Sequence, residues 1–377
     1  MQLVPTYLFT VFSKWFYNRM IDQAVCVIPA HFDDRNENIT VHGRSIRSWF
    51  QLSKNVIRIL GQNPGKFTLQ GTNTYLVGTR NPYVLIDTGE GKDEYIPLLQ
   101  NELENRRKVT DAVDISDIII THRHGDHCGG LPSVLSLLGK LWSNRKGSSA
   151  GFTPPRIHKI PLTASDDKLK SVVDSLPPSS YTPTPSGSPL HDLKDGQHLP
   201  VVSDGDASES LQILHTPGHT QDSLCLYFAP DNALFTADTV LGQGTAVFED
   251  LGEYMRSLQK ILDFNKDPAH QYTLVYPGHG PVVEDGPQHV GMYYKHRLDR
   301  ETQIVAVLVS DTNATSQGGE KSLTTWDIVG TLYKNYPENL WEAAAHSVNL
   351  HLRKLEEDGK VKLVEGAGKD SRWVVLH

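Results

Sequence analysis

The feature that most constrains this chain is a dense cluster of ionisable side chains in the segment Thr-His-Arg-His-Gly-Asp-His-Cys, at residues 121–128. Four of them are of the kinds that bind metal ions: His122, His124, Asp126 and His127. Ionisable side chains rarely gather in a protein interior without a charged partner or a metal. The cluster follows the run Asp-Ile-Ile-Ile at residues 117–120, which predicts a strand. Because side chains at i and i+2 share a face of a strand and the next turn adds two more, the cluster suits two adjacent metal ions.

Three other segments carry isolated ligand-type residues in the same kind of setting. Each residue follows an apolar strand and a tight turn: His219, Asp238 and His279. A Pro-Gly pair before His219 and before His279 predicts a turn that directs the imidazole outward, and small neighbours leave room for an ion. Together the five histidines and two aspartates provide three ligands for each of two ions and one shared carboxylate. Imidazole and carboxylate suit zinc, and a catalytic zinc site keeps one position open, so we expect two Zn²⁺ per chain.

Each of these elements also has an ordinary explanation. Alone, a Pro-Gly-His turn or an aspartate before a threonine is usually a turn without a function. The His-x-His-x-Asp-His block at residues 122–127 occurs together with three partners in the right order, and this combination favours one joint site over four independent turns.

Length, charge and cysteine content restrict the class of protein. The chain has 377 residues, enough for an ample core, and its formal net charge of −8 argues against a surface built wholly for nucleic acid. Three widely spaced cysteines predict no disulfide framework and favour a reducing compartment. The apolar segment at residues 3–16 is too short to span a bilayer, so we expect no membrane insertion. We therefore expect an intracellular protein of the cytoplasm or, because Lys14 and Arg19 precede the first acidic residue, of the mitochondrion.

Hydrophobic patterning predicts an N-terminal extension followed by a large domain. Residues 1–50 carry no clear period and predict a poorly ordered extension. Residues 51–310 predict one domain with surface insertions near 142–155 and 175–189, which are rich in Gly, Ser or Pro. Strands are expected at residues 56–60, 74–77, 83–86, 118–120, 211–214, 224–228, 233–235 and 274–276, and helices at residues 94–108, 251–264 and 288–310. Two strand-rich halves with helices between them predict an α/β fold of two packed sheets flanked by helices.

Residues 320–377 form a third part. Helical patterns at 324–336 and 340–358 precede a hairpin pattern at 359–364 and 372–376, which is the order of a small winged-helix unit. Its basic residues are largely offset by acidic ones. The charge pattern therefore leaves open three roles for this unit: contact with RNA, packing against a neighbour, and formation of a homodimer.

These residues resemble the metallo-β-lactamase superfamily, and within its glyoxalase II-like group they resemble the β-lactamase-like protein 2 branch. The resemblance extends beyond the ligands to the segments at residues 63–65, 69–77, 85–89, 244–251 and 276–281. It covers the chain from about residue 50 to its end. It implies a four-layer αββα sandwich with a winged-helix-like C-terminal unit.

The resemblance also implies a role for each candidate residue. It assigns the first metal to His122, His124 and His219, the second metal to Asp126, His127 and His279, and a bridging position to Asp238. Asp87 is implied to orient a ligand histidine, and Asn73 to line the substrate side. Arg123 stands where a tryptophan is common in the branch, so we expect it to alter the mouth of the site.

The implied chemistry is hydrolysis by a hydroxide held between two zinc ions and aligned by Asp126. The branch resemblance implies a metal-dependent endoribonuclease that acts on single-stranded RNA. An alternative is a thioesterase that releases a polyketide from an acyl carrier protein, because fungal proteins of this kind share the segment at 244–251. Hydroxyacylglutathione hydrolases share the ligands and lack the C-terminal unit. A third kind of function, a binding module without catalysis, would be indicated by a missing ligand, and all seven positions are present.

Overall fold

The computed structural model describes residues 31–32, 38–41, 44–145, 150–204, 209–312 and 322–376. Much of the predicted N-terminal extension therefore lies outside the described residues, and within it β1 (His31–Phe32), β2 (Asn38–Val41) and β3 (Arg44–Arg47) form a small antiparallel sheet. The chain divides into two compact units. The first comprises Met1–His215, Asp222–Ala246 and Pro268–Gly286, and the second comprises Thr216–Gln221, Val247–Asp267 and Pro287–His377.

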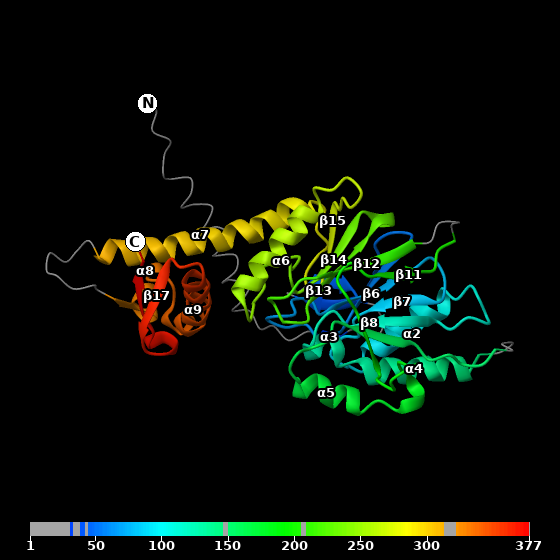
Figure 1. Cartoon of the computed structure of the whole chain (residues 1–377). Coiled ribbons are helices and arrows are strands. Elements are labelled where there is room, and N and C mark those ends of the chain that lie inside the picture. Colours follow the sequence, from blue (N-terminus) through cyan, green and yellow to red (C-terminus); the bar gives the residue numbers. More distant parts are fainter. Residues whose placement is uncertain are drawn as a thin grey trace. The chain divides into compact units, whose positions relative to one another are not determined.

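Two mixed sheets form the body of the first unit (Figure 1). The first has the order β10-β9-β8-β7-β6-β5-β4, and its strands are β4 (Trp49–Gln51), β5 (Val56–Leu60), β6 (Asn73–Val77), β7 (Tyr83–Ile86), β8 (Ile115–Ile119), β9 (Arg156–Lys159) and β10 (Leu190–Asp192). The second runs in sequence order, with β11 (His198–Val201), β12 (Glu209–His215), β13 (Leu224–Phe228), β14 (Ala233–Ala237) and β15 (Leu274–Pro277). Strands β7 to β10 pair in parallel, as do β14 and β15. The predicted α/β class with two packed sheets is confirmed.

The hydrophobic core explains why the central strands carry apolar residues on both faces. Every residue of β5, β6 and β7 is buried. On one face, Ile57, Leu76 and Leu85 join a core with α2 (Tyr95–Asn105) and α4 (Leu131–Ser143). On the other face, alternate residues of the same strands pack against apolar residues of β12 and β13. A sheet covered on both faces has no polar side, so its strands show no alternation of polar and apolar residues.

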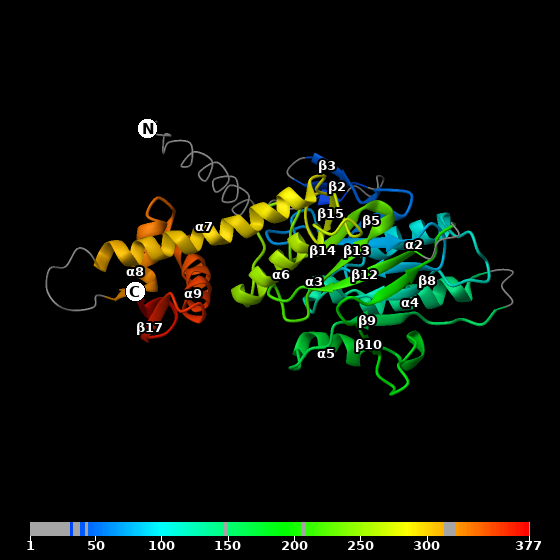
Figure 2. The ribbon, with the colours of Figure 1, turned by 45° about the horizontal axis from the view of Figure 1, so that its top comes forward.

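The second unit contains two long helices and the C-terminal part of the chain (Figure 2). Its elements are α6 (Leu251–Phe264), α7 (Gly286–Thr312), β16 (Leu323–Thr324), α8 (Thr325–Leu332), α9 (Trp341–Glu357), β17 (Val361–Glu365) and β18 (Arg372–Val375). The strands pair in the order β16-β18-β17, and α8 packs on α9, so the predicted winged-helix-like arrangement is confirmed. Among the described residues no helix is both long enough and apolar enough to cross a bilayer.

Two helices differ from the expectations drawn from the sequence. Helix α8 ends at Leu332 and does not continue to residue 336, because Pro337 disfavours helical geometry in the residue before it and the chain turns at Tyr333. Helix α4 was not predicted, although Pro132 in its first turn is a common start signal. Its last residues, Trp142 and Ser143, fall within the segment expected to be a surface insertion.

Candidate metal centre

The ligand-type residues follow strands of both sheets. His122 and His124 come just after β8, and His124 is the extended residue that precedes the one-turn helix α3 (Gly125–Cys128). This short turn contains Asp126 and His127, and its backbone is closed by a hydrogen bond from the His127 N–H to the His124 carbonyl, 3.0 Å. Side chains on the strand end and on the turn therefore converge, as the spacing of the cluster predicts.

Two residues from the second sheet meet this cluster. Asp238 follows β14 and His279 follows β15, and these strands are parallel neighbours. His279 Nε2 lies 3.2 Å from Asp126 Oδ2 and 3.2 Å from Asp238 Oδ2. His127 Nε2 lies 3.4 Å from oxygens of the same two carboxylates. The structure therefore brings Asp126, His127, Asp238 and His279 together.

His122 and His124 lie beside these four residues. His122 Nε2 and His124 Nδ1 are 3.0 Å apart, and the rings of His122 and His127 have centroids 4.1 Å apart. His122, His127 and Asp238 form one group whose ligand atoms lie within 4.8 Å of one another, and Asp126, His127 and His279 form another. The two groups share His127, so the ligand atoms form one continuous cluster.

The cluster fits a divalent metal. His127 Nε2 is buried and donates or accepts no hydrogen bond, although it faces two carboxylates. Burial opposes the charged imidazole, but Asp126 and Asp238 outweigh it and hold the pKa of His127 well above its usual value. In the same way, burial lowers and the carboxylates raise the pKa of His279, to about 9. A buried site that favours positive charge this strongly, with imidazole and carboxylate donors, suits a cation such as zinc.

Asp87 contacts the ring nitrogen of His127 that points away from the cluster. Its Oδ2 lies 2.8 Å from His127 Nδ1, and its carboxylate also accepts hydrogen bonds from the Thr121 N–H and hydroxyl, each 2.8 Å. Asp87 has a backbone φ of 59°, in the left-handed region, which aspartate tolerates better than most residues. A proton on Nδ1 that is donated to Asp87 leaves the Nε2 lone pair directed at the cluster, the tautomer that a metal ligand needs.

A second support was not predicted from the sequence. The Thr72 hydroxyl donates to Asp126 Oδ2, 3.1 Å, and Asn63 accepts from the Thr72 N–H, 2.9 Å, and donates to its hydroxyl, 3.0 Å. These contacts fix the carboxylate of Asp126. The available signal was that both residues lie in segments that resemble the β-lactamase-like protein 2 branch, at 63–65 and 69–77.

The structure places Asn73 differently from its expected position on the substrate side. Its side chain is fully buried and donates to the carbonyls of Pro277, 2.8 Å, and Gly280, 3.0 Å. Its backbone N–H also donates to the Gly278 carbonyl, 2.7 Å. Asn73 therefore holds the turn that carries His279, and a buried amide with these partners is not available to a substrate.

His219 lies in the second unit, in the segment Thr216–Gln221. The side chain is buried, and Nδ1 donates to the Val247 carbonyl, 2.8 Å. This hydrogen bond leaves Nε2 as the nitrogen that could bind a metal. Its assignment to the first metal stays a prediction.

Comparisons with known proteins agree with the fold and the cluster. Residues 67–279 match the model of the metallo-β-lactamase superfamily, more than half of the chain. The chain belongs to the metallo-β-lactamase superfamily. Residues 324–373 match the β-lactamase-associated winged helix domain. Members of the superfamily are generally metal-dependent hydrolases, and this chain is an enzyme of that kind.

The relatives of this chain include a β-lactamase-like protein 2 homolog and an acyl carrier protein thioesterase. The chain is 37% identical to the β-lactamase-like protein 2 homolog of Drosophila melanogaster, over 85% of this chain and 94% of the relative. It is 32% identical to an atrochrysone carboxyl ACP thioesterase of Aspergillus novofumigatus, over 91% of each chain. Among solved structures, a β-lactamase domain protein from Burkholderia ambifaria shares the fold, with a TM-score of 0.59 at 16% identity, over 87% of this chain and 93% of that one.

Arg123, the departure from the branch between His122 and His124, is held by carboxylates. Its Nε lies 2.9 Å from Asp166 Oδ2 and its Nη1 lies 3.9 Å from Asp222 Oδ1. Asp166 also accepts a hydrogen bond from the Leu169 N–H as the N-cap of α5 (Asp167–Asp174). The guanidinium is therefore tied to α5, which limits how far it can reach toward a substrate.

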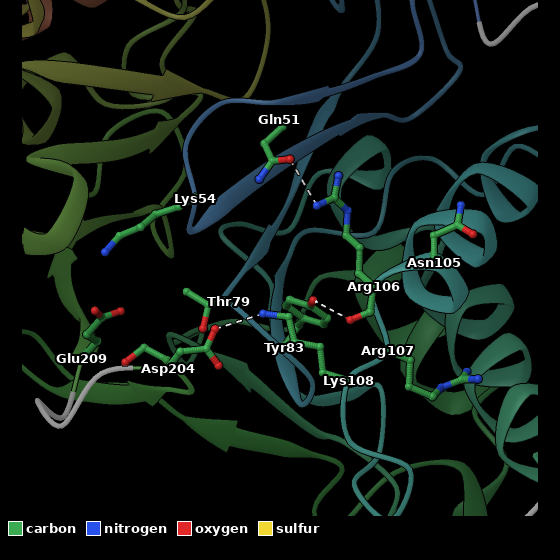
Figure 3. A pocket seen from close by; sticks show the side chains of 11 residues that line it. Gln51, Lys54, Thr79, Tyr83, Asn105, Arg106, Arg107, Lys108, Asp204 and Glu209 are labelled. Atoms are coloured by element: carbon green, nitrogen blue, oxygen red, sulfur yellow. Dashed lines mark hydrogen bonds and ion pairs between the residues drawn. The ribbon is translucent and has the colours of Figure 1, made fainter.

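A surface pocket of about 620 Å³ lies at the other end of the first sheet of this metallo-β-lactamase fold. Tyr83, at the start of β7, lines it, whereas the ligands follow the ends of β8, β14 and β15 (Figure 3). Of its cations, Arg107 pairs with Asp114, and Lys108 pairs with Asp204, 3.0 Å. This pocket is therefore separate from the metal centre, and its charges are largely balanced by neighbours.

Gly278 supplies a test of the metal centre. A Cβ at this position would lie 2.3 Å from Asp238 Oδ1 and 3.0 Å from His127 Cε1, so Gly278→Ala must displace a candidate ligand. We expect the variant to bind metal about 10- to 100-fold more weakly, as changes next to metal ligands do. Metal content after dialysis against a weak chelator measures this. Gly139→Ala is the control because a Cβ there has no atom within 4 Å, and equal metal binding by both variants would contradict the proposed position of the metal.

Proposed function

We propose that the protein is a dinuclear zinc hydrolase that cleaves single-stranded RNA internally. The observation that carries the dinuclear part is the number of ligand-type side chains that converge in the first unit: four histidines and two carboxylates, with Asp126 and Asp238 each 3.2 Å from His279 Nε2. One zinc ion usually takes four ligands, so six such side chains suit two neighbouring ions better than one.

In this proposal each ion has three protein ligands and one shared carboxylate. His122, His124 and His219 would hold the first ion, Asp126, His127 and His279 would hold the second, and Asp238 would be the shared carboxylate. When bound, such ions lower the pKa of water and polarise the bond that is cleaved. Zinc is the proposed metal because the donors are imidazole and carboxylate.

The side chains around the ions have separate roles in the proposal. Asp126 would align the attacking water, because its side chain is 22% exposed against 12% for Asp238 and is the more accessible of the two carboxylates. Thr72 fixes the Asp126 carboxylate by its hydrogen bond. Asp87 keeps the His127 proton on Nδ1. The rigid carboxylate and the fixed tautomer reduce the reorganisation needed during hydrolysis.

Similarity favours RNA over a thioester as the substrate. Identity to the β-lactamase-like protein 2 homolog is 37%, and the branch resemblance implies an endoribonuclease. Identity to the ACP thioesterase is 32%, and its name makes release of an acyl group from an acyl carrier protein the second candidate function. A reducing compartment, the cytoplasm or the mitochondrion, is in keeping with Cys128 and Cys225, which are buried and not joined in a disulfide.

A side-by-side assay distinguishes the candidates. Wild type and the double variant Asp126→Ala, His127→Ala are tested on a quenched single-stranded RNA and on an acyl-pantetheine thioester. We expect the wild type to cleave the RNA and the variant to be slower by at least about a thousandfold, because two ligands of a cooperating unit are lost. RNA cleavage that persists in the variant would come from a contaminant and defeat the nuclease assignment.

The other outcomes point to the other functions. Hydrolysis of the thioester alone, lost in the double variant, identifies a thioesterase. Metal-loaded protein that cleaves neither substrate but binds the RNA supports a binding module. Asp192→Asn is the matched control, since Asp192 is an exposed carboxylate on β10 of the same unit and is expected to behave as wild type.

A further inference from the structure

The loop that carries His219 clusters with the C-terminal part of the chain. Thr216–Gln221 belongs to the same compact unit as Val247–Asp267 and Pro287–His377, whereas the strands that flank the loop in sequence belong to the first unit. The loop therefore packs with residues of the second unit.

Two sets of hydrogen bonds hold the backbone of the loop, and a third holds the side chain of His219. The Gly218 carbonyl accepts from the N–H groups of Glu249, 2.8 Å, and Asp250, 3.1 Å. The Pro217 carbonyl accepts from the hydroxyl of Ser257, 2.7 Å, on α6. The imidazole of His219 donates from Nδ1 to the Val247 carbonyl. Residues 247–257 therefore supply partners to the Pro217 and Gly218 carbonyls and to the His219 imidazole.

The loop packs closely against the backbone of α6 at Gly218. A Cβ at Gly218 would lie 2.3 Å from Tyr254 Cα, and the residue has a φ of +127°. Only glycine combines that backbone conformation with so close an approach. Any movement of Tyr254 would therefore be transmitted to the loop.

Phe248 and Tyr254 are fixed in turn by residues of α7 and α9. Their rings stack with centroids 5.3 Å apart and an interplanar angle of 25°. The guanidinium carbon of Arg297, on α7, lies 5.0 Å from the Phe248 centroid and 5.9 Å from that of Tyr254. The ring of His351, on α9, meets Phe248 edge-on, with centroids 6.2 Å apart and an angle of 86°.

These contacts are buried, and burial makes them strong. Arg297 is 5% exposed and His351 is 1% exposed. A cation packed on aromatic faces is held more strongly away from water than at an exposed site. Burial, reinforced by Arg297, lowers the pKa of His351 to about 2, so the imidazole is neutral and packs as an aromatic ring. A nearby ion pair from α7 to α9, Glu301 to Lys354 at 3.1 Å, ties the two helices together.

We propose that α7 and α9 position the loop that presents His219: Arg297 and His351 hold Phe248, and through it Val247, whose carbonyl accepts the hydrogen bond from His219. This proposal rests on the proposed role of His219 as a ligand. Arg297, His351 and Phe248 are then positioning residues that act through the loop. The winged-helix-like unit accordingly has a function in metal retention whatever the substrate is.

The test compares metal retention in four full-length variants. Arg297→Met removes the cation and keeps most of the apolar stem, Phe248→Leu removes the aromatic face, and His219→Ala removes the ligand itself. Lys295→Met is the matched control, because Lys295 lies on the same helix, is 63% exposed and pairs with Asp299, 2.9 Å. Zinc per chain after dialysis and the rate of zinc transfer to a chromogenic chelator are measured, with thermal unfolding followed by circular dichroism.

We expect His219→Ala to lose one of the two zinc ions. Arg297→Met and Phe248→Leu are expected to release one zinc ion about 10- to 100-fold faster than wild type, while the other ion and the far-ultraviolet spectrum are unchanged. Lys295→Met is expected to match wild type. Because a general loss of structure would release both ions, loss of one ion alone identifies positioning.

Two results would overturn the proposal, and they differ from each other. His219→Ala loses zinc in the first result, while Arg297→Met and Phe248→Leu retain it at the wild-type rate. The ligand assignment of His219 is then correct, and the positioning role of Arg297 and Phe248 is wrong. In the second result His219→Ala retains both ions. His219 is then not a ligand, and the proposal that Arg297 and Phe248 position it is wrong as well. Should Arg297→Met lack a cooperative unfolding transition, Phe248→Leu alone decides, and Phe248→Tyr, which keeps the ring, is expected to retain zinc as wild type does.

Discussion

Replacing Asp238 with alanine is expected to remove most of the bound metal and to slow hydrolysis by at least about a thousandfold. The two oxygens of Asp238 face two different histidines: Oδ1 lies 3.4 Å from His127 Nε2, and Oδ2 lies 3.2 Å from His279 Nε2. Loss of this carboxylate removes the negative charge that the histidines share and the one ligand proposed for both ions. We therefore expect fewer than one metal ion per chain, measured by elemental analysis of protein purified without added metal.

Two comparisons make this expectation specific. Asp192→Asn, an exposed carboxylate of the same unit, is expected to keep the wild-type metal content and rate. Asp238→Asn keeps the shape but not the charge, and we expect it to retain more metal than Asp238→Ala and less than wild type. An Asp238→Ala protein that still carries two ions per chain would show that the ions bind elsewhere and refute the dinuclear centre.

The metal cluster could be recognised from the sequence because its geometry is local. His122, His124, Asp126 and His127 follow one strand within six positions, and a strand end followed by a turn brings such residues together whatever the rest of the fold is. Asp238 and His279 were recognisable for a related reason. Each follows a short apolar strand, and neighbouring parallel strands end at the same edge of a sheet.

The supports of the cluster could not be predicted in this way. Thr72 contacts Asp126 across more than 50 positions of sequence, with Asn63 bonded to Thr72, and no spacing rule links an isolated threonine to a carboxylate so distant. Asn73 was expected on the substrate side because it adjoins a shared motif, yet its amide is buried under the His279 turn. Hydrogen bonds that cross between strands depend on register, which a pattern of residue types does not specify.

The role of the C-terminal part could likewise not be predicted from the sequence. The order of its helices and hairpin could be predicted from the periodicity of apolar residues. The sequence left three roles open for it: contact with RNA, packing against a neighbour, and dimerisation. The contacts that favour a role in packing join Phe248 to Arg297 and His351, about 50 and 100 positions further along the chain. A buried arginine on a helix looks the same in sequence as one on a solvated face.

Replacing Asp87 with asparagine is expected to weaken metal binding about 10- to 100-fold while the protein stays folded. Asparagine can still accept the hydrogen bond from the Thr121 N–H, but its amide group would face His127 Nδ1 and donate to it. His127 must then carry its proton on Nε2, the nitrogen that faces Asp126 and Asp238. That tautomer has no lone pair for a metal at Nε2, so the loss arises from the position of one proton.

A second aspartate–histidine pair in the same unit provides the control. Asp117 Oδ1 lies 2.7 Å from His158 Nε2, both side chains are buried, and neither residue belongs to the metal cluster. Asp117→Asn and Asp87→Asn are each expected to lower the free energy of unfolding by about 1–3 kcal/mol, because each disturbs a buried hydrogen-bonded pair. Only Asp87→Asn is expected to change the metal affinity, measured by competition with a chelator. Equal metal affinity in the two variants would mean that Asp87 only stabilises the fold and does not set the tautomer of His127.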